Sequence, residues 1–281
     1  MNRISRILLF ALDLIGVLVL LYLNLPSKEE IVQPPGSGWT LIFSDDFTGE
    51  NVNSTYWNTQ YWFGRTNQGN LEFEWYQDDE VFVQNGILRL KAQRRAVHGY
   101  KFSSGMISSH EKVSFTYGYV ELRARVPKGT GLWPAFWLLP SSKIWPPEID
   151  VFEIVGSQTN NVLFHLHYAD SVQRLHTIGS AWVGPDFAEG WHVFAIDWEP
   201  NSITWYVNGV VRSRYVGPRV PHEPMYLVAN LAVGGSTTPP SYFDIIPRYF
   251  DVIPGYFAII PDYFDTIPSY FDIDYIRVWQ Q

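Results

Sequence analysis

Three acidic residues, Glu148, Asp150 and Glu153, lie close together in a stretch that is otherwise rich in Ile, Val and Phe. Such residues favour a strand, in which successive side chains point to opposite faces. Glu148 and Asp150 therefore share one face, whereas Glu153, at an odd offset from Glu148, would point to the apolar side. Because burying an unpaired carboxylate there is costly, we predict a one-residue bulge near residues 151–152. The bulge would return Glu153 to the acidic face.

Three carboxyl groups on one strand face repel one another, which raises the pKa of at least one of them. In glycoside hydrolysis an ionised carboxylate attacks the anomeric carbon and a protonated one gives its proton to the leaving oxygen. With the bulge, Glu148 and Glu153 lie two pleat steps apart, roughly 6–7 Å between Cα atoms. Their carboxyl groups could then reach the separation of about 5–5.5 Å found in retaining enzymes. Asp150 could hydrogen-bond the nucleophile, although the spacing alone equally fits a solvated acidic face or a cation site.

Aromatic residues surround this stretch. Trp133 and Trp137 precede it, and Trp145 stands three residues before Glu148. Sugar rings stack their apolar faces on indole rings while their hydroxyl groups need polar partners. The aromatic density therefore favours a carbohydrate site over a plain acidic surface.

Composition narrows the class of protein. The chain has 281 residues, of which 46% are hydrophobic and 17% charged, so it can bury a core and is neither disordered nor collagen-like. It has no cysteine, which excludes disulfides, thiolate metal sites and cysteine nucleophiles. A net charge of −8 argues against a nucleic-acid partner held through phosphates. We expect a monomer.

The elements that would position these residues are short strands. Residues 119–126 alternate between apolar and polar side chains, and Asn208-Gly209 joins residues 202–207 and 210–215 in a pattern typical of a type I′ hairpin. Many short strands separated by turns predict an all-β fold, a β-sandwich of jelly-roll type. Further strands are predicted at residues 39–43, 81–83, 87–92, 192–198, 225–233 and 273–279.

The N-terminal segment indicates export. Arg3 and Arg6 precede an apolar run over residues 7–25, which is close to the length that spans a bilayer. Positive charge in front of the run predicts a cytoplasmic N-terminus and an exported body. We interpret residues 1–25 as a signal peptide or a membrane anchor helix, residues 26–38 as a linker, and residues 39–281 as one domain that works outside the cell or at its surface.

Residues 240–274 are five tandem copies of a seven-residue unit, each of which begins with proline and contains Tyr-Phe. Proline in every unit excludes a continuous helix. We expect an expanded repeat that forms a surface excursion. An aromatic ladder that binds glycan or lipid is the alternative.

Several segments together carry a resemblance to glycoside hydrolase family 16. Glu148-Ile-Asp-Val-Phe-Glu153 resembles the bulged E-I-D-x-x-E signature of the laminarinase, β-agarase and κ-carrageenase branches. Gly131-Leu-Trp-Pro-Ala-Phe-Trp-Leu-Leu-Pro140, Gly69-Asn-Leu-Glu72 and Trp205-Tyr-Val-Asn-Gly209 resemble further family segments in the expected order. Relative to the family, four of the seven-residue units are surplus.

The resemblance implies a jelly roll with a glycan cleft on its concave face and a retaining mechanism without a catalytic cofactor. It implies Glu148 as the nucleophile, Asp150 as its helper and Glu153 as the acid/base. It also implies a structural calcium ion near Asp274. The substrate-binding residues implied by the resemblance are Asn70, Trp133, Trp137, Trp145 and His167.

Two functions remain open from the sequence. The first is an exported retaining endo-β-glycanase that hydrolyses β-1,3-glucan (laminarin) or mixed-linkage β-glucan. The alternative is a non-catalytic glycan-binding jelly-roll module at the cell surface. The complete set of Glu148, Asp150 and Glu153 favours the enzyme, because binding alone needs no such cluster.

Overall fold

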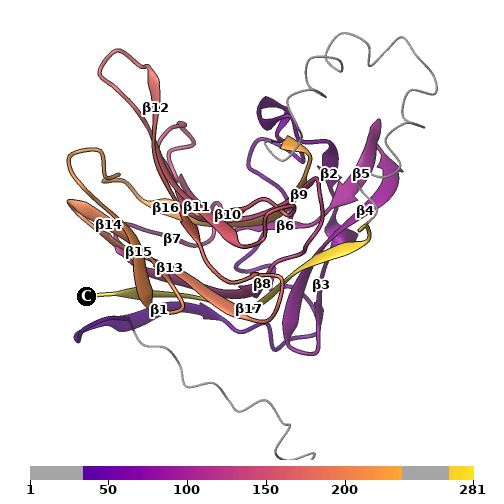
Figure 1. Ribbon diagram of the computed structural model, residues 1–281, viewed down its shortest axis with the longest axis horizontal. Coiled ribbons are helices and arrows are strands. Elements are labelled where there is room, and N and C mark those ends of the chain that lie inside the picture. Colours follow the sequence, from indigo (N-terminus) through magenta and orange to yellow (C-terminus); the bar gives the residue numbers. More distant parts are fainter. Residues whose placement is uncertain (1–33, 236–265) are drawn as a thin grey trace, which may run out of the picture. The chain divides into compact units, whose positions relative to one another are not determined.

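The computed structural model describes residues 34–235 and 266–281, and in these ranges the chain is built from strands with only two short 3₁₀ turns, Gln68–Asn70 and Asp78–Glu80 (Figure 1). The strands are β1 (Thr40–Asp45), β2 (Glu74–Tyr76), β3 (Val81–Gln84), β4 (Ile87–Val97), β5 (Tyr100–Ser104), β6 (Met106–Ser108), β7 (Ser114–Phe115), β8 (Gly118–Arg125), β9 (Leu132–Pro140), β10 (Glu148–Ile154), β11 (Asn161–Ala169), β12 (Leu175–Val183), β13 (His192–Glu199), β14 (Ser202–Val207), β15 (Val210–Val216), β16 (Met225–Val233) and β17 (Ser269–Gln280).

Two sheets face each other across the core (Figure 1). One has the order β15-β14-β13-β8-β17-β4-β5-β2, with β1 paired to β17 and β3 to β4. The other has the order β12-β11-β10-β9-β16-β6, with β7 paired to β16. Strands far apart in the chain are neighbours, as β16 beside β9 and β17 beside β8. The predicted all-β sandwich of jelly-roll type is confirmed.

Alternating side chains fill the space between the sheets. On β8, Val120, Leu122 and Ala124 are fully buried, as their predicted alternation requires. Phe152 of β10 stacks on Phe194 of β13 with ring centroids 4.1 Å apart, so one aromatic pair joins the two sheets at the strand that carries the acidic cluster. Burial of apolar surface on this scale is the main stabilising contribution to such a fold.

The structure contains every strand that the sequence predicts, within a few residues at each end. The predicted hairpin between β14 and β15 is also confirmed, because Asn208 and Gly209 both have positive φ, 52° and 72°, as a type I′ turn requires. Strands β9, β11 and β12 are present without having been predicted.

The last seven-residue unit, residues 268–274, differs from the expected surface excursion. It forms the beginning of β17, pairs with β4 and β8, and buries Phe271 and Ile273 completely. Asp272 accepts a hydrogen bond from Arg125 at 2.6 Å. This unit is therefore part of the sheet because its Phe and Ile alternate with the strand period. The first three units, residues 261–265 of the fourth, and the predicted signal or anchor segment lie outside the described residues. Among the residues that are described, no helix is long and apolar enough to cross a membrane.

Replacing Phe271 by Ala is expected to lower the free energy of unfolding by about 3–5 kcal/mol, because it leaves a cavity beside Phe152, whose ring centroid lies 6.0 Å away. Tyr270→Ala is the matched control. Tyr270 is 36% exposed and lies against Arg89, so its loss should cost at most about 1 kcal/mol. Urea unfolding of both variants measures the difference. Equal losses would show that the unit contributes no core packing.

Candidate active site

Strand β10 carries the acidic cluster on its outer face. It pairs with β11 through Asp150↔His165 and then Glu153↔Leu163, so three steps on β10 oppose two on β11. The pairing with β9 shifts at the same place. This irregularity confirms the predicted bulge, and Val151 is the additional residue. The bulge lets Val151 and the rest of the strand's apolar side chains stay fully buried, while the three carboxyl groups point away from the core.

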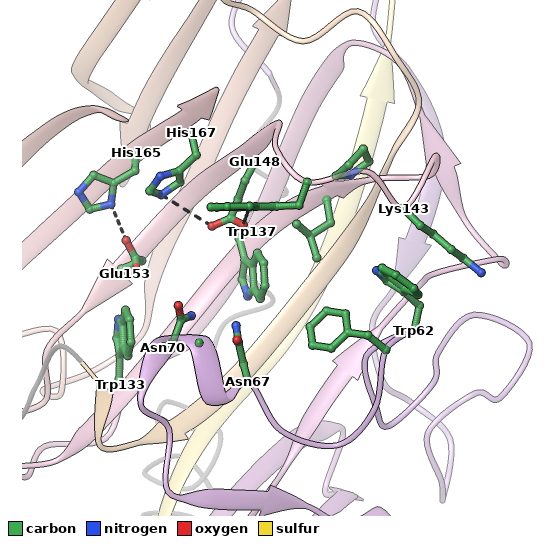
Figure 2. A pocket seen from close by; sticks show the side chains of 15 residues that line it. Trp62, Asn67, Asn70, Trp133, Trp137, Lys143, Glu148, Glu153, His165 and His167 are labelled. Carbon is green, nitrogen blue, oxygen red and sulfur yellow. Dashed lines mark hydrogen bonds and ion pairs between the residues drawn. The ribbon is translucent and has the colours of Figure 1, made fainter. Parts of the chain in front are cut away.

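Two histidines on the neighbouring strand β11 lie between the carboxyl groups (Figure 2). The Nδ1–H of His165 donates to Glu153 Oε2 at 2.5 Å, and the same nitrogen lies 3.8 Å from Asp150 Oδ2. His167 Nε2 lies 3.1 Å from Asp150 Oδ2 and 3.7 Å from Glu148 Oε1. Carboxyl and imidazole groups thus alternate along the floor of the site, which reduces the repulsion among the acids.

The backbone of β12 leaves room for His165. Gly179 pairs directly with His165, and a Cβ atom at this glycine would lie only 2.7 Å from the imidazole ring. Any other residue would therefore have to displace the ring. The glycine allows His165 to lie flat along the sheet, within reach of Glu153.

Asp150 is the deepest of the three acids, with 3% of its surface exposed. Its backbone carbonyl accepts a hydrogen bond from Trp205 Nε1 at 2.8 Å, which ties the bulged strand to the opposite sheet. Asp150 lies below Glu148 and Glu153, and its charge raises the pKa of Glu148. The two glutamates, and not Asp150, are among the residues that line the cleft.

Burial and mutual repulsion change the protonation of the cluster. Burial, together with the charge of Asp150, raises the pKa of Glu148 well above its usual range. Burial and the charge of Glu153 raise the pKa of Asp150 in the same way. Burial alone would lower the pKa of His165, but its hydrogen bond to Glu153, together with the charges of Glu153 and Asp150, outweighs this effect and raises it. The cluster therefore retains a proton at pH values where separate carboxyl groups would all be ionised.

Trp145 is a polar partner as well as an aromatic surface. Its Nε1–H donates to Glu148 Oε2 at 2.7 Å, while half of the side chain stays exposed. This hydrogen bond favours the ionised form of Glu148. The indole ring is left beside the carboxylate, where a sugar ring could stack on it.

A cleft of about 570 Å³ opens above the cluster, within the range typical of ligand sites. In Figure 2, Trp133 and Asn70 lie toward Glu153, whereas Trp62 and Lys143 lie toward the opposite end. The cleft is lined by Trp62, Phe63, Asn67, Gly69, Asn70, Trp133, Trp137, Leu139, Pro140, Lys143, Trp145, Glu148, Glu153, His165 and His167.

A buried hydrogen-bond network supports the floor of the cleft. Trp137 Nε1 donates to Asn230 Oδ1 at 2.8 Å, and the amide of Asn230 donates to the Tyr76 hydroxyl at 3.0 Å. Tyr76 in turn donates to Glu72, which also accepts from Asn70. Glu72 therefore connects two cleft residues, Asn70 and Trp137, through groups that are almost wholly buried.

All the substrate-binding residues implied by the sequence line the cleft, together with Glu148 and Glu153, and Asp150 lies beneath them. Sequence reasoning missed His165, although alternation in β11 of buried Val162, Phe164 and Leu166 with more exposed residues would have placed it on the outer face. Other missed cleft residues lie outside strands and carry no periodic signal: Trp62, Phe63, Asn67 and Lys143. Gly69, next to Asn70, and the end of β9, Leu139 and Pro140, were missed as well.

The candidate calcium residue, Asp274, is not among the residues that line the cleft. Its carboxylate forms an ion pair with Arg123, which already neutralises its charge. In the described part of the chain, no group of three acidic or histidine side chains gathers around it. A cation there would need backbone carbonyls or water as most of its ligands, and the calcium site stays a prediction.

Comparison with known proteins shows where the chain belongs. Residues 67–242 match the family model of glycosyl hydrolases family 16. The endo-1,3-1,4-beta-glycanase EglC of Rhizobium meliloti is 34% identical over 224 residues, which are 72% of this chain and 48% of that protein. The glucan endo-1,3-beta-glucosidase A1 of Niallia circulans is 32% identical over 238 residues, 72% of this chain and 35% of that protein. The chain thus spans about half or less of the length of these relatives.

A solved structure gives the same assignment. The laminarinase catalytic domain from Thermotoga maritima superposes with a TM-score of 0.70 at 29% identity, covering 87% of this chain and 99% of that domain. The matched family segment includes the bulged strand β10 and the histidine strand β11. On these grounds the chain belongs to glycosyl hydrolase family 16.

Proposed function

We propose that the protein is a retaining endo-β-glycanase that hydrolyses β-1,3-glucan (laminarin) or mixed-linkage β-glucan. The observation that carries the proposal is the bulge in β10, which brings Glu148 and Glu153 to the floor of one aromatic cleft with Asp150 beneath them. The substrates named for the relatives, 1,3- and 1,3-1,4-β-glucans, support the same class of polysaccharide.

The reaction follows from two carboxyl groups in different states. Ionised Glu148 attacks the anomeric carbon, while protonated Glu153 gives its proton to the departing glycosidic oxygen, so the leaving sugar departs as a neutral alcohol. A covalent glycosyl-enzyme ester remains. Glu153, now ionised, takes a proton from water as the water oxygen attacks the same carbon and releases Glu148. Two inversions restore the original configuration.

Neighbouring side chains hold these two groups in place. The indole N–H of Trp145 stabilises the charge on Glu148, and the His165 imidazole fixes the orientation of the Glu153 carboxyl. Asp150 lies next to both histidines, 3.8 Å from His165 Nδ1 and 3.1 Å from His167 Nε2, and keeps a carboxyl group beside them when Glu148 is consumed in the ester. Aromatic residues on both sides of the carboxyl groups allow sugars to bind on both sides of the cleaved bond, as cleavage within a chain requires.

Glu148→Gln is expected to lower kcat on laminarin by several orders of magnitude, because an amide cannot form the ester. Glu153→Gln should lower it by about 10²–10⁴-fold. Glu50→Gln, at an exposed glutamate outside the cleft, is the matched control and should keep full activity. Reducing-sugar release and proton NMR of the first anomer measure the outcome.

Retention predicts that the β-anomer is released first. Release of the α-anomer first, or undiminished cleavage by Glu148→Gln, would contradict the mechanism. A wild-type chain that binds laminarin without cleaving it would instead support the glycan-binding module.

The acid limb of the pH profile should reflect the raised pKa of Glu148. Since Glu148 must be ionised to attack, kcat/KM is lost as the pH falls through this pKa, above the value of about 4.3 of an ordinary glutamate. Asp150→Asn removes a negative charge that raises the pKa, so the acid limb should move to lower pH. Profiles of kcat/KM between acid and neutral pH test this, and a limb that stays or moves upward in the variant argues against the coupling.

We further propose that the protein works outside the cytoplasm, secreted or held at the cell surface by residues 7–25. Arg3 and Arg6 in front of this apolar run support the proposal. Expression of the full chain in a bacterium should place glucanase activity outside the cytoplasm, and deletion of residues 1–25 should retain it inside. The same distribution with and without these residues would refute the proposal.

A further inference from the structure

Two imidazoles and one carboxylate converge on a single point between β10 and β11. One possible ligand atom from each of Asp150, His165 and His167 lies within 4.8 Å of the other two. Asp150 Oδ2 is 3.8 Å from His165 Nδ1 and 3.1 Å from His167 Nε2. Within residues 34–235 and 266–281, this is the one group of three such side chains with that geometry.

The distances fit a transition metal. Zinc holds imidazole nitrogen and carboxylate oxygen at about 2.0–2.2 Å in a tetrahedron, so its ligand atoms lie about 3.3–3.5 Å from each other. The observed separations of 3.1 Å and 3.8 Å lie on either side of this value. Two nitrogens and one oxygen also favour zinc or copper over calcium or magnesium, which prefer oxygen ligands alone.

Neighbouring side chains hold the atoms that would bind the metal. Thr177 Oγ1 lies 2.8 Å from His167 Nδ1, the ring nitrogen that faces away from Asp150. When His167 carries its proton on Nδ1, that N–H donates to the threonine and leaves the Nε2 lone pair free for a metal, as outer partners of metal-bound histidines do. The hydrogen bond from Trp205 holds the backbone of Asp150. Three protein ligands, of which His165 and His167 line the cleft, match the ligand number of an open zinc site.

We propose that Asp150, His165 and His167 form a binding site for a divalent transition metal such as Zn²⁺, and that the metal inhibits the enzyme. Binding displaces the proton that His165 shares with Glu153, and this proton passes to solvent. The ion occupies the space between the carboxyl groups and competes with Glu153 for its imidazole partner. No oxidation or reduction takes place.

Metal binding does not depend on the proposed hydrolysis, whereas inhibition rests on it, and separate measurements address the two. Isothermal titration with ZnCl₂ on the full chain without a polyhistidine tag reads binding alone. We expect one zinc ion per chain. His165→Gln and His167→Gln should each weaken binding by at least about tenfold, since even the loss of an outer partner of a metal ligand costs 10–100-fold.

Two further variants make the test specific. His176→Gln is the matched control, because His176 also bonds an aspartate, Asp170, at 3.0 Å but outside the cleft, and it should bind zinc as the wild type does. Thr177→Val keeps both imidazoles and should weaken binding about 10–100-fold. Circular dichroism confirms that each variant is folded. Absence of zinc binding in the wild type, or unchanged binding in both glutamine variants, would overturn the site.

The inhibition is read on laminarin. Zinc should abolish hydrolysis by the wild-type chain, and a chelator should restore it. Hydrolysis that persists with zinc bound at saturation would overturn the inhibitory role. If zinc binds but no hydrolysis occurs under any condition, the metal site stands and the proposed enzymatic function fails.

Discussion

The alternation of side chains along β10 is the constraint on which the site depends. A strand between two sheets has one buried face, and in this strand that face belongs to Ile149, Phe152 and their neighbours. If Val151 were part of a regular strand without the bulge, Phe152 would point to the acidic face and Glu153 to the core. Burying Glu153 against the phenylalanine stack would cost several kcal/mol. The bulge keeps the apolar side chains in the core and the three carboxyl groups on the cleft face, and it brings these acids close together.

That crowding explains why the neighbouring strand carries imidazoles. Three carboxyl groups on a half-buried face could not all be ionised, and burial already raises the pKa of Glu148 and Asp150. His165 and His167 supply donors directly between the acids, at 2.5–3.8 Å. The arrangement on which the proposed hydrolysis depends also resembles the ligand set of a zinc site, because both need nitrogen and oxygen atoms that converge on one point.

The position of a residue can be predicted from the sequence where the residue belongs to a local pattern, such as the alternation of a strand. The strand of the acidic cluster, its bulge and the β14–β15 hairpin were predictable, because alternation and the Asn-Gly turn are local signals. His165 was missed although its strand alternates. Trp62 and Phe63 were missed for a different reason, since they reach the cleft from irregular backbone whose course only the packed sheets determine.

Two buried carboxyl groups, Glu72 and Glu74, lie in the hydrogen-bond network beneath the cleft floor. Burial and the charge of Glu74 raise the pKa of Glu72, and burial raises the pKa of Glu74. Glu74 accepts the backbone N–H of Val233 at 2.8 Å, while Glu72 accepts from Tyr76 and so reaches Trp137 through Asn230. Protonation lowers the cost of burying two carboxyl groups side by side. The Trp137 indole, which lines the cleft, is thus oriented by a hydrogen bond to the neutral amide of Asn230, whose strength varies less with salt than that of an ion pair.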